Sequence, residues 1–397
     1  MCSSDLFMKI EGAERVQVKL KHFTSYQQEQ IRKLKQQGKN VINLGRGNPD
    51  QETFPKIINR LKSAIDEVGN QGYPPYGGKV TLKKAIIKFY DDEYGVKLTE
   101  DEVTIFSGSL AALTALPMSL VNPNDIVLTP DPAFFGYDSG IKMASAFSYP
   151  LPLTKENNYL PEYDLIPNDV LEKAKLLFLN YPNNPTGAGA TSDFFKRTVE
   201  FARKNNIVVA HDFAYSDISF KSKSPSFLQT DGAKEVGIEI YTLSKTFNMA
   251  GWRIAFAIGN KQIINLLKGY IKASVGGTFG AVQDAAIYAL LNSQSERKEL
   301  RNLYKSRRDL AYSLLKAAGF DVVDSEGTFF LWFKLPKRFS DDVSFVDSLL
   351  FEKQVALIPG STFGKNGEGY LRLSLVSDLG YIEEGIRRLI NFVNENG

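Results

Sequence analysis

The chain has 397 residues, of which 43% are apolar and 12% aromatic, enough to bury a sizeable core in about two or three domains. Its 48 basic and 45 acidic residues leave a net charge of +3 without a basic block, which argues against a nucleic-acid partner. Cys2 is the only cysteine, and His22 and His211 are the only histidines. An internal disulfide, a cysteine or histidine metal cluster and a Ser-His-Asp hydrolase are therefore disfavoured.

The amino terminus lacks a basic region followed by an apolar stretch, so we expect no secretory signal and a cytoplasmic location, with Met8 as a candidate natural start. The uncharged stretch at 103–124 has the length of a membrane span. Gly108 and Pro117 interrupt it, and its start is typical of a strand that leads into a helix. We expect no membrane partner.

In chain order, residues 1–48 are polar and helical before the short apolar run at 41–44. They are too short for a core of their own. We expect this segment to pack on a small C-terminal domain or on a partner subunit.

Residues 49–293 alternate helical periods with fully apolar runs, a pattern typical of a mostly parallel sheet covered on both faces. This region is predicted to be a large domain, and ligands of such sheets collect at the carboxyl ends of the strands. The predicted strands are 103–106, 126–128, 176–179, 207–210, 238–241 and 254–258.

Residues 294–397 change pattern and predict a smaller α+β domain. A charged helix is expected at about 301–318 and a closing helix from Gly380, with strands at 328–335, 355–358 and 370–376. The run 360–365 looks like a phosphate-binding P-loop, but it is one residue too short and lacks the following Ser or Thr. We interpret it as a surface loop.

Polar residues follow several predicted strands. Ser107-Gly108-Ser109 directly follows one strand and opens a helix, where backbone N–H groups can hold an anion. Asn184 lies in a proline-flanked turn after the strand predicted at 176–179, and Asp212 and Tyr215 follow the strand at 207–210. The alternatives are a plain strand-to-helix cap, a rigid turn and an N-cap, respectively.

Lys245 has hydroxyl residues on both sides and Arg253 eight residues later. A lysine becomes a nucleophile toward a carbonyl when burial or a nearby cation lowers its pKa. Arg253 with Thr242 or Ser244 is suited to hold the phosphate of a phosphorylated aldehyde beside it. The alternative is a helix cap followed by a solvated lysine.

Together these motifs make the sequence resemble the class I/II aminotransferases among the pyridoxal phosphate (PLP) enzymes, over essentially its whole length. Within that family it looks most like the LL-diaminopimelate aminotransferases and the methionine-salvage transaminases. The motifs that carry the resemblance are Tyr73-Pro74-Pro75-Tyr76-Gly77-Gly78, Ser107-Gly108-Ser109, Pro130-Asp131-Pro132, Asn184-Pro185-Thr186-Gly187, His211-Asp212-Phe213-Ala214-Tyr215, the run from Lys245 to Arg253, and Leu371-Arg372-Leu373-Ser374.

The resemblance implies an aspartate-aminotransferase-like α/β fold, PLP as cofactor and a homodimer in which Tyr73 reaches the partner's site. It implies that Lys245 carries the cofactor, Asp212 pairs with its ring nitrogen, and Tyr215 and Asn184 contact its ring hydroxyl. Arg372 and Gly45 match the contacts to the substrate α-carboxylate. The remaining expected cofactor contacts are Gly108, Ser109, Leu110, Thr242, Ser244, Arg253 and Phe134, where the family often has Tyr or Trp. His211 is expected behind Asp212.

The expected reaction is a ping-pong exchange of an amino group between an amino acid and a 2-oxo acid. The candidate pocket walls, Tyr76, Phe134, Phe135 and Phe279, favour a methionine-like or aromatic side chain, and no second arginine is placed to meet a distal carboxylate. An LL-diaminopimelate aminotransferase and a carbon–sulfur lyase on the same fold stay as alternatives. A PLP-binding regulatory module is disfavoured because residues 1–48 leave no room for a helix-turn-helix domain.

Overall fold

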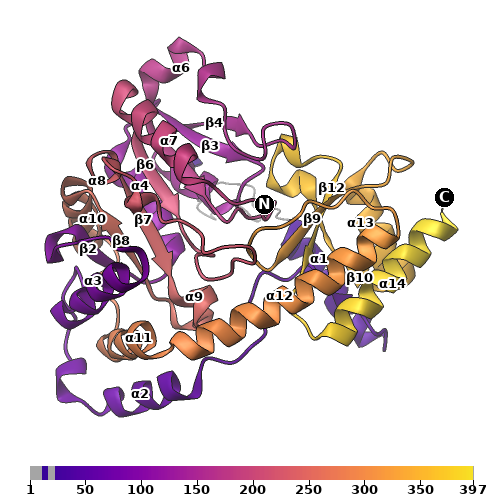
Figure 1. The fold of residues 1–397 in the computed structure, drawn as a ribbon, viewed down its shortest axis with the longest axis horizontal. Coiled ribbons are helices and arrows are strands. Elements are labelled where there is room, and N and C mark those ends of the chain that lie inside the picture. Colours follow the sequence, from indigo (N-terminus) through magenta and orange to yellow (C-terminus); the bar gives the residue numbers. More distant parts are fainter. Residues whose placement is uncertain (1–10, 17–22, 397) are drawn as a thin grey trace, which may run out of the picture.

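The computed structural model describes residues 11–16 and 23–396 (Figure 1). A seven-stranded sheet, in the order β2-β8-β7-β6-β5-β3-β4, forms the centre of the larger part. Strands β7, β6, β5, β3 and β4 are parallel, and β8 runs antiparallel to both β7 and β2. This confirms the predicted α/β fold with a mostly parallel sheet. The strands are β2 (Val103–Phe106), β3 (Ile126–Asp131), β4 (Phe147–Pro152), β5 (Ala174–Asn180), β6 (Val208–Asp212), β7 (Gly237–Thr242) and β8 (Ala255–Gly259).

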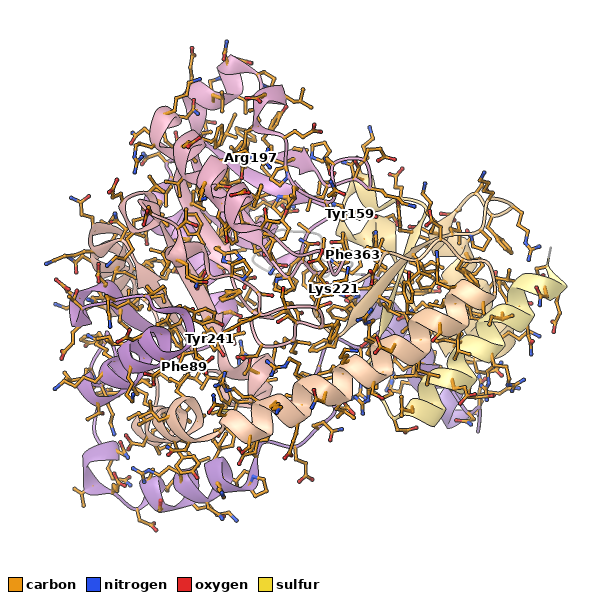
Figure 2. The ribbon with its side chains drawn as sticks, in the orientation of Figure 1. Phe89, Tyr159, Arg197, Lys221, Tyr241 and Phe363 are labelled. Carbon is orange, nitrogen blue, oxygen red and sulfur yellow. The ribbon has the colours of Figure 1, made fainter. Side chains whose placement is uncertain are left out.

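Both faces of this sheet are buried because successive apolar residues of each strand point to opposite sides. Leu177 and Leu179 of β5 pack in the core cluster with α3, α7 and α11, whereas Leu176 and Phe178 pack in the cluster with α4, α5 and α10. On the first face the rings of Phe89 and Tyr241 meet edge to face with centroids 5.5 Å apart (Figure 2). The helices are α3 (Val80–Tyr94), α4 (Ser109–Leu120), α5 (Gly136–Met143), α7 (Ser192–Asn205), α10 (Lys261–Ala273) and α11 (Gly280–Asn292).

Shorter elements connect these layers and lead into the strand ends. They are α2 (Pro55–Ile65), η2 (Val68–Asn70), η3 (Glu100–Glu102), η4 (Tyr163–Leu165), α6 (Asn168–Lys173), η5 (Phe227–Gln229), α8 (Ala233–Val236), α9 (Leu243–Thr246) and η6 (Ala250–Trp252).

The C-terminal part contains a three-stranded antiparallel sheet in the order β11-β12-β9. The residues of α12, α13 and α14 share one apolar cluster with β9 and β12. These elements are α12 (Gln294–Ala317), β9 (Phe330–Lys334), α13 (Asp342–Lys353), β10 (Val355–Ala356), β11 (Ile358–Pro359), η7 (Gly360–Phe363), η8 (Lys365–Gly367), β12 (Tyr370–Ser374) and α14 (Leu379–Glu395).

The N-terminal segment contacts this C-terminal part. β1 (Ile42–Asn43) pairs in parallel with β10, and Ile31 and Leu34 of α1 (Phe23–Gln36) pack on Leu350 and Ala356. A short turn, η1 (Glu14–Val16), precedes α1. The domain boundaries at 48/49 and 293/294 stay predictions.

The structure differs from the sequence-based expectation in several places, and β4 was not among the predicted strands. Helix α12 begins at Gln294 rather than near 301, and the strand expected at 355–358 is divided between β10 and β11. The expected surface loop at 360–365 is partly buried, because Phe363 packs edge to face on Trp332. In the described ranges, no helix combines the length and apolar character that a membrane crossing requires.

Candidate active site

A cavity of about 540 Å³ opens at the carboxyl ends of the parallel strands, between the central sheet and the C-terminal part. Such strand ends are the usual ligand position in α/β sheets. The structure brings most predicted site residues to this one cavity: Gly45, Ser109, Leu110, Phe134, Asn184, Asp212, Tyr215, Thr242, Ser244, Lys245, Arg253 and Arg372.

Lys245 lies on α9, one turn after β7 ends. Thr242 caps this helix by accepting from the Ser244 N–H at 3.2 Å, and the Lys245 Nζ donates to the Gly47 carbonyl at 2.8 Å. Burial, together with the positive charges of Arg372 and Arg253, lowers the pKa of Lys245 to about 8 against the opposing effect of Asp212. A neutral amine is therefore within reach near neutral pH, as a carbonyl nucleophile requires.

Asp212 is the last residue of β6 and is buried. Its Oδ2 accepts from the Tyr137 hydroxyl at 3.0 Å. Its buried Oδ1 has no hydrogen-bond partner among the described residues. Burial raises the pKa of Asp212 to about 6, although the bond from Tyr137 and the charge of His211 lower it. A buried carboxylate oxygen without a donor is costly, so this atom is suited to a ligand that brings an N–H.

The opposite end of the cavity is built for an anion. Ser109 begins the twelve-residue helix α4, and Gly108 precedes it with φ +94°. The Arg253 guanidinium lies so close that a Cβ on Gly108 would be 2.2 Å from Arg253 Nη2. Arg253 is held by a bond from its Nη1 to the Ala250 carbonyl at 2.8 Å. A helix N-terminus, an arginine and the Ser244 hydroxyl together suit a phosphate group.

Arg372 of β12 also lines the cavity. Its Nη1 donates to Asn184 Oδ1 at 2.9 Å and its Nη2 to the Gly45 carbonyl at 3.3 Å. The guanidinium carbon lies 4.0 Å from the ring centroid of Phe330 and 4.6 Å from that of Phe363. Burial lowers the pKa of Arg372 to about 10. The stacking fixes the plane of the fork, which is the geometry that recognises a carboxylate.

The bond to Arg372 determines how Asn184 faces the cavity. Because Asn184 Oδ1 accepts from Arg372, its Nδ2 is the group left to donate to a ligand. Asn180 supports this position, since its Oδ1 accepts from the Asn184 N–H at 2.8 Å and its Nδ2 donates to the Asp212 carbonyl at 2.7 Å. The side-chain amide of Asn180, at the end of β5, therefore helps to position both Asn184 and Asp212.

Residues 39–389 match the family described as aminotransferase class I and II. The chain belongs to this aminotransferase family. It is 42% identical over 384 residues, 96% of each chain, to the L-glutamine--4-(methylsulfanyl)-2-oxobutanoate aminotransferase of Bacillus subtilis. It is also 42% identical over 359 residues to an LL-diaminopimelate aminotransferase of Aquifex aeolicus, covering 90% of this chain and 92% of the relative.

The solved structures agree with this assignment. A substrate-bound structure of BacF from Bacillus subtilis has a TM-score of 0.93 and 41% identity, and the match covers 97% of this chain and 98% of that one. The family resemblance and the aspartate-aminotransferase-like fold predicted from the sequence are thus confirmed. The enzyme is an aminotransferase that exchanges an amino group between an amino acid and a 2-oxo acid.

Aminotransferases of this class use PLP, and the residues present in this aminotransferase fit that cofactor. The unpartnered Oδ1 of Asp212 is suited to accept a hydrogen bond from a protonated ring nitrogen. The space beside Gly108 and Arg253, called the phosphate cradle here, is suited to a phosphate. Lys245, with its lowered pKa, lines the same cavity and matches the aldehyde. Tyr215, whose pKa burial raises, meets Phe329 edge to face with centroids 5.4 Å apart.

Sequence reasoning missed two residues of this aminotransferase site. Tyr137 and Asn180 both contact Asp212, but the sequence analysis assigned neither of them a role. Asn180 carried a readable signal, since it is a polar residue at the end of an apolar strand, as Asp212 is. Tyr137 carried none, because it lies inside α5, where an aromatic residue normally indicates core.

Three aromatic residues named from the sequence do not line the cavity: Tyr73 is fully exposed, and Tyr76 and Phe279 are half exposed. Tyr76 and Phe279 do not line the cavity of their own chain, whereas Phe134 and Phe135 do. The segment that carries Tyr73 is short and lies between two anchored ends, and Tyr73 does not line the cavity of its own chain.

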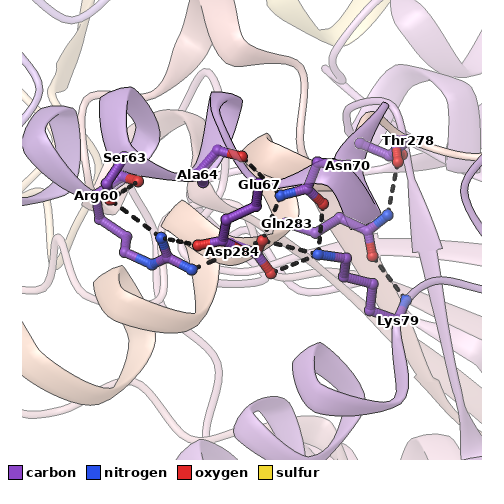
Figure 3. Close-up of polar contacts among 9 residues, drawn as sticks. All are labelled: Arg60, Ser63, Ala64, Glu67, Asn70, Lys79, Thr278, Gln283 and Asp284. Atoms are coloured by element: carbon purple, nitrogen blue, oxygen red, sulfur yellow. Dashed lines mark hydrogen bonds and ion pairs between the residues drawn. The ribbon is translucent and has the colours of Figure 1, made fainter. Parts of the chain in front are cut away.

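The anchors of that segment are polar and largely buried (Figure 3). Asp284 of α11 accepts from Asn70 Nδ2 at 2.8 Å and forms an ion pair with Lys79 Nζ at 2.7 Å. The Gln283 side chain accepts from the Lys79 N–H at 2.8 Å and donates to the Thr278 carbonyl at 2.6 Å. Residues 70 and 79 are thereby fixed to α11.

His211 lies behind Asp212 and is fully buried. Its Nδ1 is 2.8 Å from Glu239 Oε2 and its Nε2 is 3.2 Å from the Tyr181 carbonyl. Glu239 also accepts from the hydroxyls of Tyr90 and Ser226. Both ring nitrogens of His211 are engaged in the core, which fits a supporting position and leaves it no access to a substrate.

Proposed function

We propose that the chain binds PLP in this cavity and transfers amino groups by a ping-pong mechanism. The observation that carries the proposal is the juxtaposition in one cavity of Lys245, with a pKa lowered to about 8, and the buried, unpartnered Oδ1 of Asp212. When bound, PLP would supply the carbonyl that captures an amino group and the ring that accepts an electron pair.

Each residue then has a separate task. Lys245 anchors the cofactor and, once displaced, moves a proton to and from the substrate Cα. Asp212 holds a proton on the ring nitrogen, while Asn184 Nδ2 and the Tyr215 hydroxyl serve the ring oxygen. Arg372 binds the substrate α-carboxylate, with Gly45 beside it.

The Gly45 amide itself donates to Asn43 Oδ1 at 3.0 Å, and its carbonyl accepts from Arg372. A side chain here would displace Ile358, because a Cβ would lie 2.9 Å from Ile358 Cδ1. In this proposal Gly45 acts by letting the backbone approach Arg372 closely.

We further propose that one substrate pair is a methionine-like amino acid and its 2-oxo acid. Phe134, Phe135 and Ile358 give the cavity an apolar wall, which suits a long uncharged side chain. The name of the Bacillus subtilis relative, which includes 4-(methylsulfanyl)-2-oxobutanoate, supports this reading. The LL-diaminopimelate relatives support the alternative of a substrate with a second charged end.

A homodimer is proposed on separate grounds. Tyr73 lies in a loop whose two ends are anchored to α11, and an exposed tyrosine held in this way suits the site of a second copy of the chain.

The test is a titration of the purified protein with PLP, followed by a panel of amino donors. Wild type should develop a cofactor absorbance band that each accepted donor bleaches, and Lys245→Ala should show no turnover while its circular dichroism is unchanged. Full transamination by Lys245→Ala would refute the assignment. Release of pyruvate and ammonia from cystathionine would indicate the lyase alternative instead.

A further inference from the structure

The loop at 360–367, whose first part resembles a phosphate-binding P-loop, lies against a carboxylate of the chain itself. Asp131 is the last residue of β3 and is buried. Its Oδ1 and Oδ2 accept from the Asn366 N–H at 3.2 and 3.3 Å, and its Oδ2 also accepts from Asn366 Nδ2 at 2.8 Å. Gly364, with φ +134°, leaves space for this carboxylate, because an added Cβ would overlap Asp131 Oδ1. Asp131 therefore ties the central sheet to a loop of the C-terminal part.

Two carboxylates hold this loop, one from each part of the chain. Asp342 of α13, in the C-terminal part, accepts from the Ser361 N–H at 2.8 Å and from the Ser361 hydroxyl at 2.9 Å. Asp131 is the carboxylate that comes from the central sheet. A backbone bond from the Ala133 N–H to the Phe363 carbonyl, at 2.8 Å, joins the same two parts. Both parts of the chain thus determine where Phe363 lies.

Phe363 connects this loop to the candidate active site. The guanidinium carbon of Arg372 lies 4.6 Å from the ring centroid of Phe363 and 4.0 Å from that of Phe330. Phe330 belongs to β9, the strand that pairs with the strand of Arg372, so strand pairing fixes that ring. Phe363 is fixed by the loop instead. A shift of the loop would remove one of the two rings that hold the plane of the Arg372 fork.

We propose that Asp131 is a positioning residue for substrate binding: by holding the loop at 360–367 it keeps Phe363 on Arg372, and it thereby sets the affinity for the substrate α-carboxylate. This inference rests on the proposed function, in which Arg372 binds that carboxylate. Asp131 is not among the described residues that line the cavity, so its effect passes through Phe363. A residue that served only the stability of the fold would affect cofactor and substrate alike.

The experiment weakens the tie from both sides. Asp131→Ala removes the acceptor, and Asn366→Ala removes the Nδ2 donor but keeps the backbone N–H. Asn205→Ala on α7 is the matched control, because Asn205 Nδ2 donates to the Phe201 carbonyl at 2.8 Å and does not line the cavity. Calorimetry measures the affinity of each PLP-loaded enzyme for 4-(methylsulfanyl)butanoate, a carboxylate without an amino or oxo group to react. The affinity of each PLP-free protein for PLP is measured beside it.

We expect Asp131→Ala and Asn366→Ala to weaken binding of this carboxylate by about fivefold or more, which corresponds to about 1 kcal/mol. Their PLP affinities, and both affinities of Asn205→Ala, should stay within about twofold of wild type. If Asp131→Ala does not fold, Asn366→Ala decides. Unchanged carboxylate affinity, or equal losses of carboxylate and PLP affinity, would overturn the role of Asp131.

A double-mutant cycle tests whether the effect passes through Arg372. With methionine as donor, Asp131→Ala should lower kcat/KM of the half-reaction in the wild-type background and cause no further loss in the Arg372→Leu background. An additive loss would overturn the inference. A wild type that binds PLP but not 4-(methylsulfanyl)butanoate would overturn it too, with the cofactor assignment intact. A wild type that binds no PLP would instead refute the proposed function.

Discussion

The Tyr137 hydroxyl donates to Asp212 Oδ2 at 3.0 Å, from inside α5 to the end of β6. The Tyr137 ring is itself immobilised, because it stacks on Phe178 with centroids 4.8 Å apart and an interplanar angle of 11°. One oxygen of the carboxylate is thereby fixed, and the other has no hydrogen-bond partner among the described residues. Tyr137 is 75 positions away from Asp212 in the chain. Its hydrogen bond orients the Asp212 carboxylate and favours the charged form of that group.

Tyr137→Phe tests that arrangement. Removing the donor raises the pKa of Asp212 further above its present value of about 6 and loses a hydrogen bond to a charged group, which contributes about 1.5–3 kcal/mol. We expect kcat of the half-reaction to fall about tenfold or more, and the acid limb of its pH profile to move to higher pH. Tyr163→Phe, which loses only the bond to Thr198 away from the cavity, is the control. An unshifted acid limb would contradict the role.

Lys245→Met should stabilise the PLP-free protein at pH 7. The folded-state pKa of Lys245, about 8, lies below its ordinary 10.5, so the charged amine destabilises the folded state fully below pH 8. Between pH 8 and 10.5 the amine of Lys245 is protonated in the unfolded state but not in the folded state. The free energy of unfolding of the wild type therefore rises with pH in this range, relative to that of the variant. We expect a gain of about 1–3 kcal/mol at pH 7 that declines toward zero by pH 10.5, measured by urea denaturation. A gain that does not change with pH would exclude this cause.

Gly108→Ala should weaken PLP binding. The residue has φ +94° and an added Cβ would lie 2.2 Å from Arg253 Nη2, so the backbone is strained and the guanidinium is displaced. A cost of about 1–3 kcal/mol corresponds to a loss of affinity of about tenfold or more. Gly269→Ala on α10, where a Cβ meets nothing within 4 Å, is the matched control. Equal affinities for the two variants would show that the cradle does not bind the phosphate.

Tyr73 and Lys245 should complement each other between subunits. If Tyr73 serves the neighbouring site, a mixture of inactive Lys245→Ala and Tyr73→Ala chains, refolded together, forms heterodimers with roughly one working site each. Activity of the mixture against its separate components is the measurement. Sedimentation of each variant confirms that dimers are present. If the mixture is no more active than its parts, each site is built from one chain.

The sequence by itself determined most strands of the central sheet and the residues at their ends, although β4 was not predicted. The apolar runs of β5, β6 and β7 predict a buried parallel sheet, and the carboxyl ends of such strands share one edge. Asp212 is the last residue of β6 and Lys245 lies on the short helix that follows β7, so local position along the chain was enough to place them together. The motifs around Arg253 and Arg372 then identified the family.

Only the tertiary structure decided which other side chains complete the site. The Tyr137 hydroxyl reaches Asp212 because α5 packs on one face of the central sheet and Asp212 is the last residue of β6 in that sheet. No local sequence pattern encodes that pairing. Arg46 enters the cavity because β1 pairs with β10, far along the chain, which brings Gly45 against Arg372. Periodicity reports which residues are buried. Strand order and long-range pairing determine which groups each residue faces. Here they decided that Tyr137 bonds to Asp212 and that Arg46 lines the cavity.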